Sequence, residues 1–111
     1  MAGTPGVTGF QGNTWTVEKT VSVGTSNVEV MASSPTRIGF CVRGRSTNTG
    51  RLALSNNPNG LGDAGIHLSA ADPPTFVRYA DLGSCVQNQW WCISSVAAQN
   101  ISILEFHSDA F

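Results

Sequence analysis

Residues 14–23 read TWTVEKTVSV, and this stretch decides the fold. From Trp15 to Val23 every second side chain is apolar apart from Lys19, and Thr, Glu or Ser stands between them. Successive side chains of a β-strand point to opposite faces, so this period of two predicts a strand with one buried face. The charge of Lys19 on the apolar face favours a long strand or one at the edge of its sheet.

The same alternation returns in shorter runs along the rest of the chain. Clusters of Gly, Asn, Pro and Ser separate the runs, and the strongest turn signal is NNPNG at 56–60. No window carries an apolar stripe at helical spacing, so little helix is expected. The expected strands are residues 15–23, 28–32, 38–43, 52–54, 66–68, 76–79, 90–94 and 101–106. The first two could form a hairpin, and residues 90–94 begin a second hairpin with the closing strand.

About eight short strands separated by turns are typical of a β-sandwich or jelly roll. A chain of 111 residues supports one hydrophobic core. We therefore expect an all-β protein whose residues 14–111 form a single jelly-roll-like antiparallel β-sandwich. Residues 1–13 are rich in Gly and Thr, with isolated apolar side chains at Val7 and Phe10, and are expected to form a flexible N-terminal arm that a partner orders.

Composition and charge narrow the classes of function. Only 12% of the residues are charged and the formal net charge is −1, so no general field attracts nucleic acid or an anionic membrane. No apolar stretch approaches the length of a membrane span. Residues 1–12 lack the basic and apolar regions of a secretory signal peptide. We expect synthesis in a reducing aqueous compartment, with neither nucleic acid nor a membrane as a direct partner.

The acids and histidines lack the spacing of an active site. Asp63, Asp72 and Asp81 lie in turn-like segments, where an Asp side chain usually caps the backbone. His67 and His107 are expected to be surface or strand histidines. No glycine-rich phosphate-binding motif occurs in the sequence. These observations predict that the protein is not an enzyme and has no catalytic residues and no cofactor.

The three cysteines, Cys41, Cys85 and Cys92, have no C-x-x-C spacing. Their odd number and spacing argue against a disulfide framework and against a structural zinc site. We expect reduced, mostly buried thiols and no metal site.

Four arginines gather with no acid between them: Arg37, Arg43, Arg45 and Arg51. Three interpretations stay open, namely a solvated loop edge, a patch that pairs with carboxylates of a partner protein, and a nucleic-acid site. Residues 44–50 contain no aromatic side chain, which disfavours nucleic acid. Arg43, Arg45 and Arg51 are candidate partner-binding residues because four arginines without local acids are expected to find acids elsewhere.

The neighbours Trp90 and Trp91 should point to opposite faces of their strand. One should be buried, and the other exposed or at an interface. An exposed Trp serves as a platform for a sugar or as an anchor in a protein interface, unless another part of the monomer covers it. Both are candidate partner-binding residues. A concave site with Asp, Asn and Gln would favour a sugar, and a flat apolar rim would favour a protein.

Five segments share a recognisable pattern: SPTRIGFCV at 34–42, LAL at 52–54, GIHL at 65–68, WWCISS at 90–95 and ISILE at 101–105. Through them residues 34–106 resemble small virion proteins of tailed phages, in particular the decoration, or staple, proteins of the short-tailed Salmonella phages. The family pattern is an "nPxRxg" strand, a "gixL" segment, a "pWwaiss" strand and a closing "vtvlE" strand. The position before the Trp pair is Gln89 where the pattern has Pro.

The resemblance implies a noncatalytic structural protein that is made in the host cytoplasm and resides on the capsid exterior. Such proteins bind junctions between major capsid proteins and stabilise the shell. The implied partners are the major capsid protein and further copies of the chain, as a homodimer or a trimer. The alternative from a different class is a lectin-like or carbohydrate-binding module on a virion surface, and an enzyme ranks third.

Overall fold

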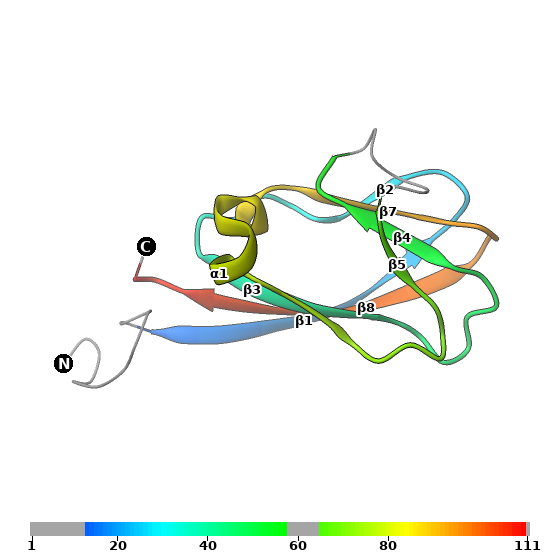
Figure 1. Ribbon diagram of the computed structural model, residues 1–111, viewed down its shortest axis with the longest axis horizontal. Coiled ribbons are helices and arrows are strands. Elements are labelled where there is room, and N and C mark those ends of the chain that lie inside the picture. The colour runs from blue at the N-terminus through cyan, green and yellow to red at the C-terminus, as the bar shows by residue number, and fades with distance from the viewer. Residues whose placement is uncertain (1–12, 58–64, 111) are drawn as a thin grey trace.

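The computed structural model describes residues 13–57 and 65–110. In this part of the chain eight strands form two antiparallel sheets of four strands each, which face one another (Figure 1). The first sheet has the order β1-β8-β3-β6 and the second β2-β7-β4-β5. The strands are β1 (Thr14–Val23), β2 (Val28–Met31), β3 (Arg37–Gly44), β4 (Leu52–Ser55), β5 (Ile66–Leu68), β6 (Thr75–Arg78), β7 (Trp90–Ser94) and β8 (Gln99–Ser108). The all-β sandwich expected from the sequence is confirmed.

The connections differ from the expected hairpins. β1 pairs with β8, from Thr14 opposite Ser108 to Val23 opposite Gln99, while β2 pairs with β7 in the other sheet. Because the two strands of each expected hairpin lie in opposite sheets, their apolar side chains face each other across the core. In a hairpin the two strands would instead lie side by side in one sheet. Both hairpin predictions are therefore wrong. The repeated crossing between sheets is compatible with a jelly-roll-like arrangement, and that finer assignment stays a prediction.

Two short helices, α1 (Tyr79–Leu82) and η2 (Gly83–Gln87), carry the chain from β6 to β7 where the sequence indicated only a turn. They lie at one end of the sandwich (Figure 1). Gly83 between them has φ of 61°, which glycine adopts without steric cost. A helix of this length is too short to show an apolar stripe, so the pattern of the sequence could not reveal it.

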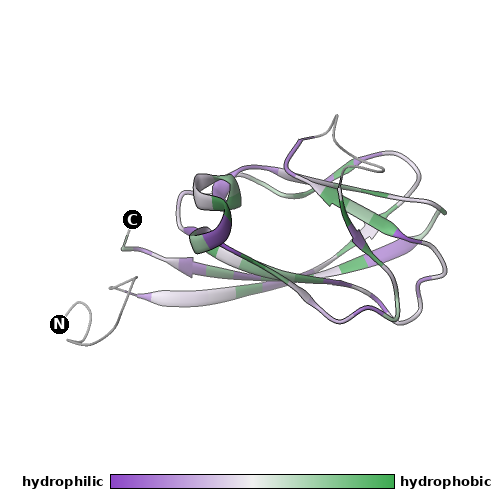
Figure 2. Ribbon diagram, viewed as in Figure 1, coloured by the Kyte–Doolittle hydropathy of each residue, from purple (hydrophilic) through white to green (hydrophobic). Residues whose placement is uncertain are grey.

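The core lies between the inner faces of the two sheets. Phe40 and Trp90 meet edge to face at its centre, with ring centroids 5.0 Å apart. The buried apolar residues around them come from strands of both sheets: Val23, Val30, Met31, Val42, Leu52, Leu54, Leu68, Val77, Cys92, Ile101 and Ile103. Figure 2 shows β4 largely hydrophobic, and the end of β1 near the N-terminus pale.

The second sheet covers only part of the first. Its strands have three to five residues, whereas β1 and β8 have ten each. At the covered end of β1, Val23 is fully buried. Towards the other end, on the same face, Val17 is 40% exposed and Trp15 is 41% exposed. Half of the inner face of β1 is therefore open, and β1 is an edge strand, as the charge of Lys19 predicted.

Candidate binding surfaces

The structure separates the predicted partner-binding residues. Val7 and Phe10 lie outside the described part of the chain. Trp90 and Trp91 point to opposite faces of β7, as the alternation requires. Trp90 is 3% exposed and donates its indole N–H to the carbonyl oxygen of Cys85 at 3.2 Å. Trp90 is therefore the buried member that was predicted for the pair, and its side chain fills the core, which leaves Trp91 as the candidate for a partner contact.

The four arginines do not form one surface patch. Arg37 is 1% exposed and forms an ion pair with Glu105, which lies far along the chain. Arg37 thus finds its acid 68 positions away in the chain itself, and it is not available to a partner. Arg43 and Arg45 are exposed on or just after β3. Arg51 is exposed beside the outer face of the second sheet.

A buried charge network lies on the inner face of the first sheet, near the end where the helices lie. Arg37 Nη1 donates to Glu105 Oε1 at 3.0 Å, and Lys19 Nζ lies 3.0 Å from Glu105 Oε2. His107 Nε2 also lies 3.0 Å from Glu105 Oε1. The ring of Trp15 stacks on His107 with centroids 5.4 Å apart. One carboxylate therefore joins side chains from β1, β3 and β8.

Burial alone would raise the pKa of Glu105, because it disfavours the charged form. The hydrogen bonds and positive charges of Lys19 and Arg37 outweigh burial and hold the pKa of this carboxyl below its usual range. Within the described residues every buried side-chain nitrogen or oxygen has a hydrogen-bond partner. His107 meets this requirement through Glu105 and through Thr36 Oγ1, 2.9 Å from its Nδ1. His107 is thus buried and bonded on both ring nitrogens.

Arg37 also holds two loop segments together. Its Nε donates to the carbonyl oxygen of Val86 at 2.8 Å, its Nη1 to that of Ala32 at 3.0 Å and its Nη2 to that of Asn88 at 2.5 Å. The backbone N–H of Ser34 adds a bond to the carbonyl oxygen of Gln87 at 2.9 Å. The segments 32–34 and 86–88 are therefore fixed relative to one another by one guanidinium group together with this backbone bond.

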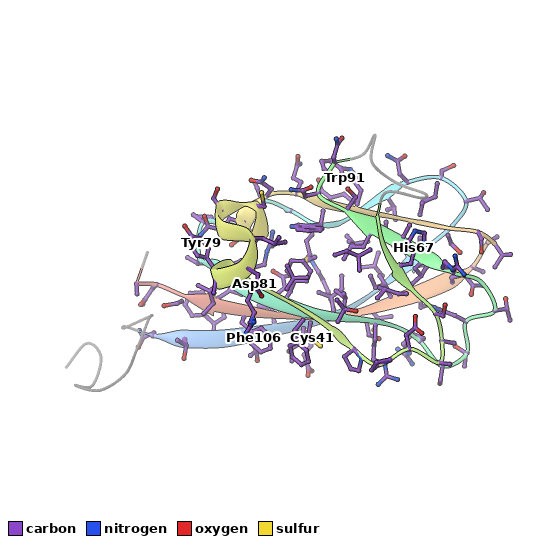
Figure 3. The ribbon with its side chains drawn as sticks, viewed as in Figure 1. Cys41, His67, Tyr79, Asp81, Trp91 and Phe106 are labelled. Atoms are coloured by element: carbon purple, nitrogen blue, oxygen red, sulfur yellow. The ribbon has the colours of Figure 1, made fainter. Side chains whose placement is uncertain are left out.

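These segments border a polar hollow of about 270 Å³ on the outside of the second sheet. Trp91 forms one wall, and Figure 3 shows it pointing away from the first sheet. Glu29 lies opposite Trp91 on β2, and Nε2 of Gln89 donates to its Oε2 at 2.8 Å. The lining residues are Ser33, Asn56, Asn88, Gln89 and Trp91. We call this site the Trp91 hollow. An aromatic side chain among amides, in a concave setting, is the arrangement that favours a sugar.

The outer face of the first sheet carries a different kind of surface. Phe76, Cys41 and Leu104 lie side by side across β6, β3 and β8, and Phe106 lies in the next row, opposite Gly39. Phe76 is 62% exposed. Figure 3 shows Cys41 and Phe106 pointing away from the second sheet. We call Cys41, Phe76, Leu104 and Phe106 the apolar strip.

The apolar strip includes a hollow of about 310 Å³ between Phe76 and Phe106. Gly39 forms its floor, and a Cβ atom at that position would lie 3.0 Å from the carbonyl oxygen of Val77. Ile38 and Tyr79 complete its apolar walls. Glycine at this position allows the close approach of the Val77 carbonyl and places no side chain in the hollow, whose apolar walls could accept an apolar side chain.

The other end of the same face is polar and basic. Arg43, Glu18 and Thr20 line a second hollow of about 420 Å³ that reaches Cys41 and Leu104 of the apolar strip. Nη1 of Arg45 donates to Thr20 Oγ1 at 3.4 Å, which places a second guanidinium at this end. Two of the predicted partner-binding arginines thus flank an apolar centre.

The three thiols are free. Cys41, Cys85 and Cys92 form no disulfide. Burial raises the pKa of Cys92 to about 12, and it also raises the pKa of Cys41, against the lowering effect of Arg43. Residues 13–57 and 65–110 contain no group of three or more His, Cys, Asp or Glu side chains that could hold a metal ion. No described helix is long and apolar enough to cross a membrane.

The charge network and the apolar strip escaped the sequence analysis, although signals for both exist. Lys19 and Glu105 each occupy an apolar-face position in an alternating strand, so buried partners could have been expected. Leu104 and Phe106 occupy the opposite face of β8 from Ile103, which indicates a strand that is apolar on both sides. The alternation alone could not show that, within residues 13–57 and 65–110, no second layer covers that outer face.

Comparison with known proteins identifies no relative. No model of a protein family matches the chain, and no curated protein and no solved structure matches it either.

Proposed function

We propose that the chain is a noncatalytic structural protein of a virion, which binds the outer capsid surface at junctions between major capsid proteins and stabilises the shell. The observation that carries the proposal is the apolar strip with Arg43 and Arg45 at its basic end. An antiparallel sheet usually exposes a polar outer face. Here that face carries two phenylalanines and a leucine, of which Phe76 is the most exposed.

This surface has the anatomy of a protein interface. Interfaces combine an apolar, aromatic centre with a charged rim, and large aromatics near the centre contribute most of the affinity. The hollow between Phe76 and Phe106 provides a pocket for one apolar side chain of a partner. Arg43 and Arg45 lie where they could pair with carboxylates of that partner. The resemblance of residues 34–106 to small virion proteins of tailed phages identifies the major capsid protein as the proposed partner.

The remaining parts of the proposal follow from the same resemblance. The protein is made in the host cytoplasm, resides on the capsid exterior, and meets further copies of itself there as a dimer or a trimer. It requires no cofactor and contacts neither nucleic acid nor a membrane directly. Many copies on one shell turn a modest contact into strong retention.

The test is cosedimentation of the purified chain with shells that lack it, followed by heating of the shells. Phe76→Asp places a charge in the apolar strip and should abolish cosedimentation and the gain in rupture temperature. Val96→Asp is the matched control, because Val96 is an exposed apolar residue between β7 and β8. Normal binding by Phe76→Asp, or shells that are equally heat-resistant without the protein, would contradict the proposal.

The alternative is a carbohydrate-binding module, and the Trp91 hollow is the observation that favours it. Its concave shape and amide lining meet the criterion for a sugar rather than a protein. The aromatic face would stack on the apolar face of a sugar ring, while Asn56, Asn88 and Gln89 would bond its hydroxyl groups.

Binding to an array of glycans separates the two functions. A carbohydrate module should bind at least one glycan, and Trp91→Ala should abolish the signal while Phe76→Ala leaves it intact. The capsid function predicts that Phe76→Ala weakens cosedimentation with shells, whereas Trp91→Ala leaves it intact. If no glycan binds the native chain, the carbohydrate function is wrong.

A further inference from the structure

The edge of the first sheet at β1 is unusually long. The four edge strands of the described sandwich are β1, β6, β2 and β5, with ten, four, four and three residues. A long edge strand presents a row of unpaired backbone groups to which another strand can add. Proteins commonly keep edge strands short or cover them. Three edges here are short, and β1 is the exception (Figure 1).

The usual protection of an edge is weak on β1. Lys19 is the single lysine of the chain, and a lysine on an edge strand normally discourages pairing. Here its ammonium group turns to Glu105 Oε2 at 3.0 Å and is neutralised there. Trp15 and Val17 are exposed on the inner face of the same strand, where the second sheet does not reach. The open edge and the open apolar face thus coincide.

We propose that β1 pairs antiparallel with β1 of a second copy, about a two-fold axis at Val17, so that two first sheets form one continuous eight-stranded sheet. The inference deepens the proposed function, since it rests on a second copy of the chain being a partner. A two-fold axis makes the contact self-complementary, and the same residues contribute from both copies.

Charge selects the register of this pairing. In a continuous sheet, residues that face each other must lie on the same face, so the axis passes through a residue of β1. An axis at Glu18 or at Lys19 would place like charges directly opposite, which destabilises a strand pair. An axis at Thr20 would cover Val21 and Val23, which are already part of the core or packed on it. An axis nearer the N-terminus would pair fewer residues of β1.

An axis at Val17 avoids these penalties. It pairs Val17 with Val17 of the partner subunit and covers both exposed side chains. It places Trp15 opposite the partner's Lys19, whose aliphatic stem can pack against the ring while its ammonium stays on Glu105. On the outer face it places Thr16 opposite the partner's Glu18. Residues 14–20 of each copy then form the new ladder.

The first experiment measures the mass of the free native chain by sedimentation over a range of concentrations. A contact of two strands is small, so the expected result is a dimer that dissociates at concentrations on the order of micromolar. Val17→Glu places two carboxylates on the axis and should weaken the dimer by about tenfold or more. Val17→Thr is the matched control and should still dimerise. Circular dichroism verifies that each variant is folded.

A second pair of variants tests the register. Thr16→Lys places a cation opposite the partner's Glu18 and should tighten the dimer, whereas Thr20→Lys faces the partner's Thr14 and should not. A native chain that stays monomeric at every concentration overturns the inference. The inference is also overturned if neither Val17→Glu nor Thr16→Lys changes the dissociation constant of the dimer. These measurements use the free protein, so failure here is distinct from failure to bind shells.

Discussion

The two halves of β8 are buried in two different ways. In the first half, Ile101 and Ile103 face the second sheet and are buried in apolar surroundings. In the second half, the same face carries Glu105 and His107, which are also buried. Glu105 is paired with Arg37 and Lys19, and His107 is bonded to Glu105 and Thr36. Where a second sheet covers the strand, dispersion and the hydrophobic effect hold it. Where that sheet ends, a hydrogen-bonded charge network takes its place.

The two halves should therefore lose stability in different ways when a side chain is removed. An apolar contact loses stability in proportion to the volume removed. A buried charge network loses most stability when a buried member is removed, because its partner then stays buried without a counter-charge, and loses least when the removed member is partly exposed. The predictions below test this contrast.

The largest effect is expected from Arg37→Ala. It leaves Glu105 without one of its two cationic partners and removes the donors to Ala32, Val86 and Asn88. Breaking a buried ion pair costs about 3 to 5 kcal/mol. Urea unfolding should report a loss in this range. Arg43→Ala, at an exposed position, serves as the control and should change the free energy of unfolding by less than about 0.5 kcal/mol.

In the covered half, Ile101→Ala should lower the free energy of unfolding by about 3 kcal/mol, because it opens a cavity in a fully buried site. The milder Ile101→Val should cost only about 1 kcal/mol. Equilibrium unfolding of both variants measures the ratio of the two losses in free energy of unfolding. Equal losses for the two variants would show that packing does not govern this half.

Acid should destabilise the half that carries the network. The pKa of Glu105 lies below its usual 4.5 in the folded protein because Lys19 and Arg37 outweigh burial. The stabilisation is therefore fully present above the unfolded pKa and is lost as the pH falls through the folded pKa. Unfolding measured from pH 6 downwards should show this loss, and Glu105→Gln should diminish it. Glu29→Gln, on the outside of the second sheet, should leave the loss of stability in acid unchanged.

The smallest effect is expected from Lys19→Met. Its side chain is about one-third exposed, so solvent screens its ion pair with Glu105, and the loss should be about 0.5 kcal/mol. Arg78→Met breaks the more exposed pair with Asp81 and should cost still less. A loss as large as that of Arg37→Ala would show that Lys19 and Arg37 contribute equally to the network.

Alternation along the chain was enough to predict the strands and the sandwich, because each strand has one face in a common core. It could not predict which strands pair, since Val23 and Gln99 meet only through the global fold. The same limit hid the partner of Arg37, which lies 68 positions away in Glu105. Alternation predicted that one tryptophan of the pair faces the core and the other faces outward. It could not predict which one, because that depends on where the core lies.

The pairing of Thr14 with Ser108 also has a consequence for biosynthesis. β1 leaves the ribosome well before its neighbour β8, which is the last of the described strands in chain order. Non-local strand pairs form slowly because the intervening chain must first be ordered. During that interval the apolar side chains of β1 remain exposed to other nascent chains. Folding of this domain should therefore finish only after β8 has been made, and dilution of the newly made chains should improve its yield.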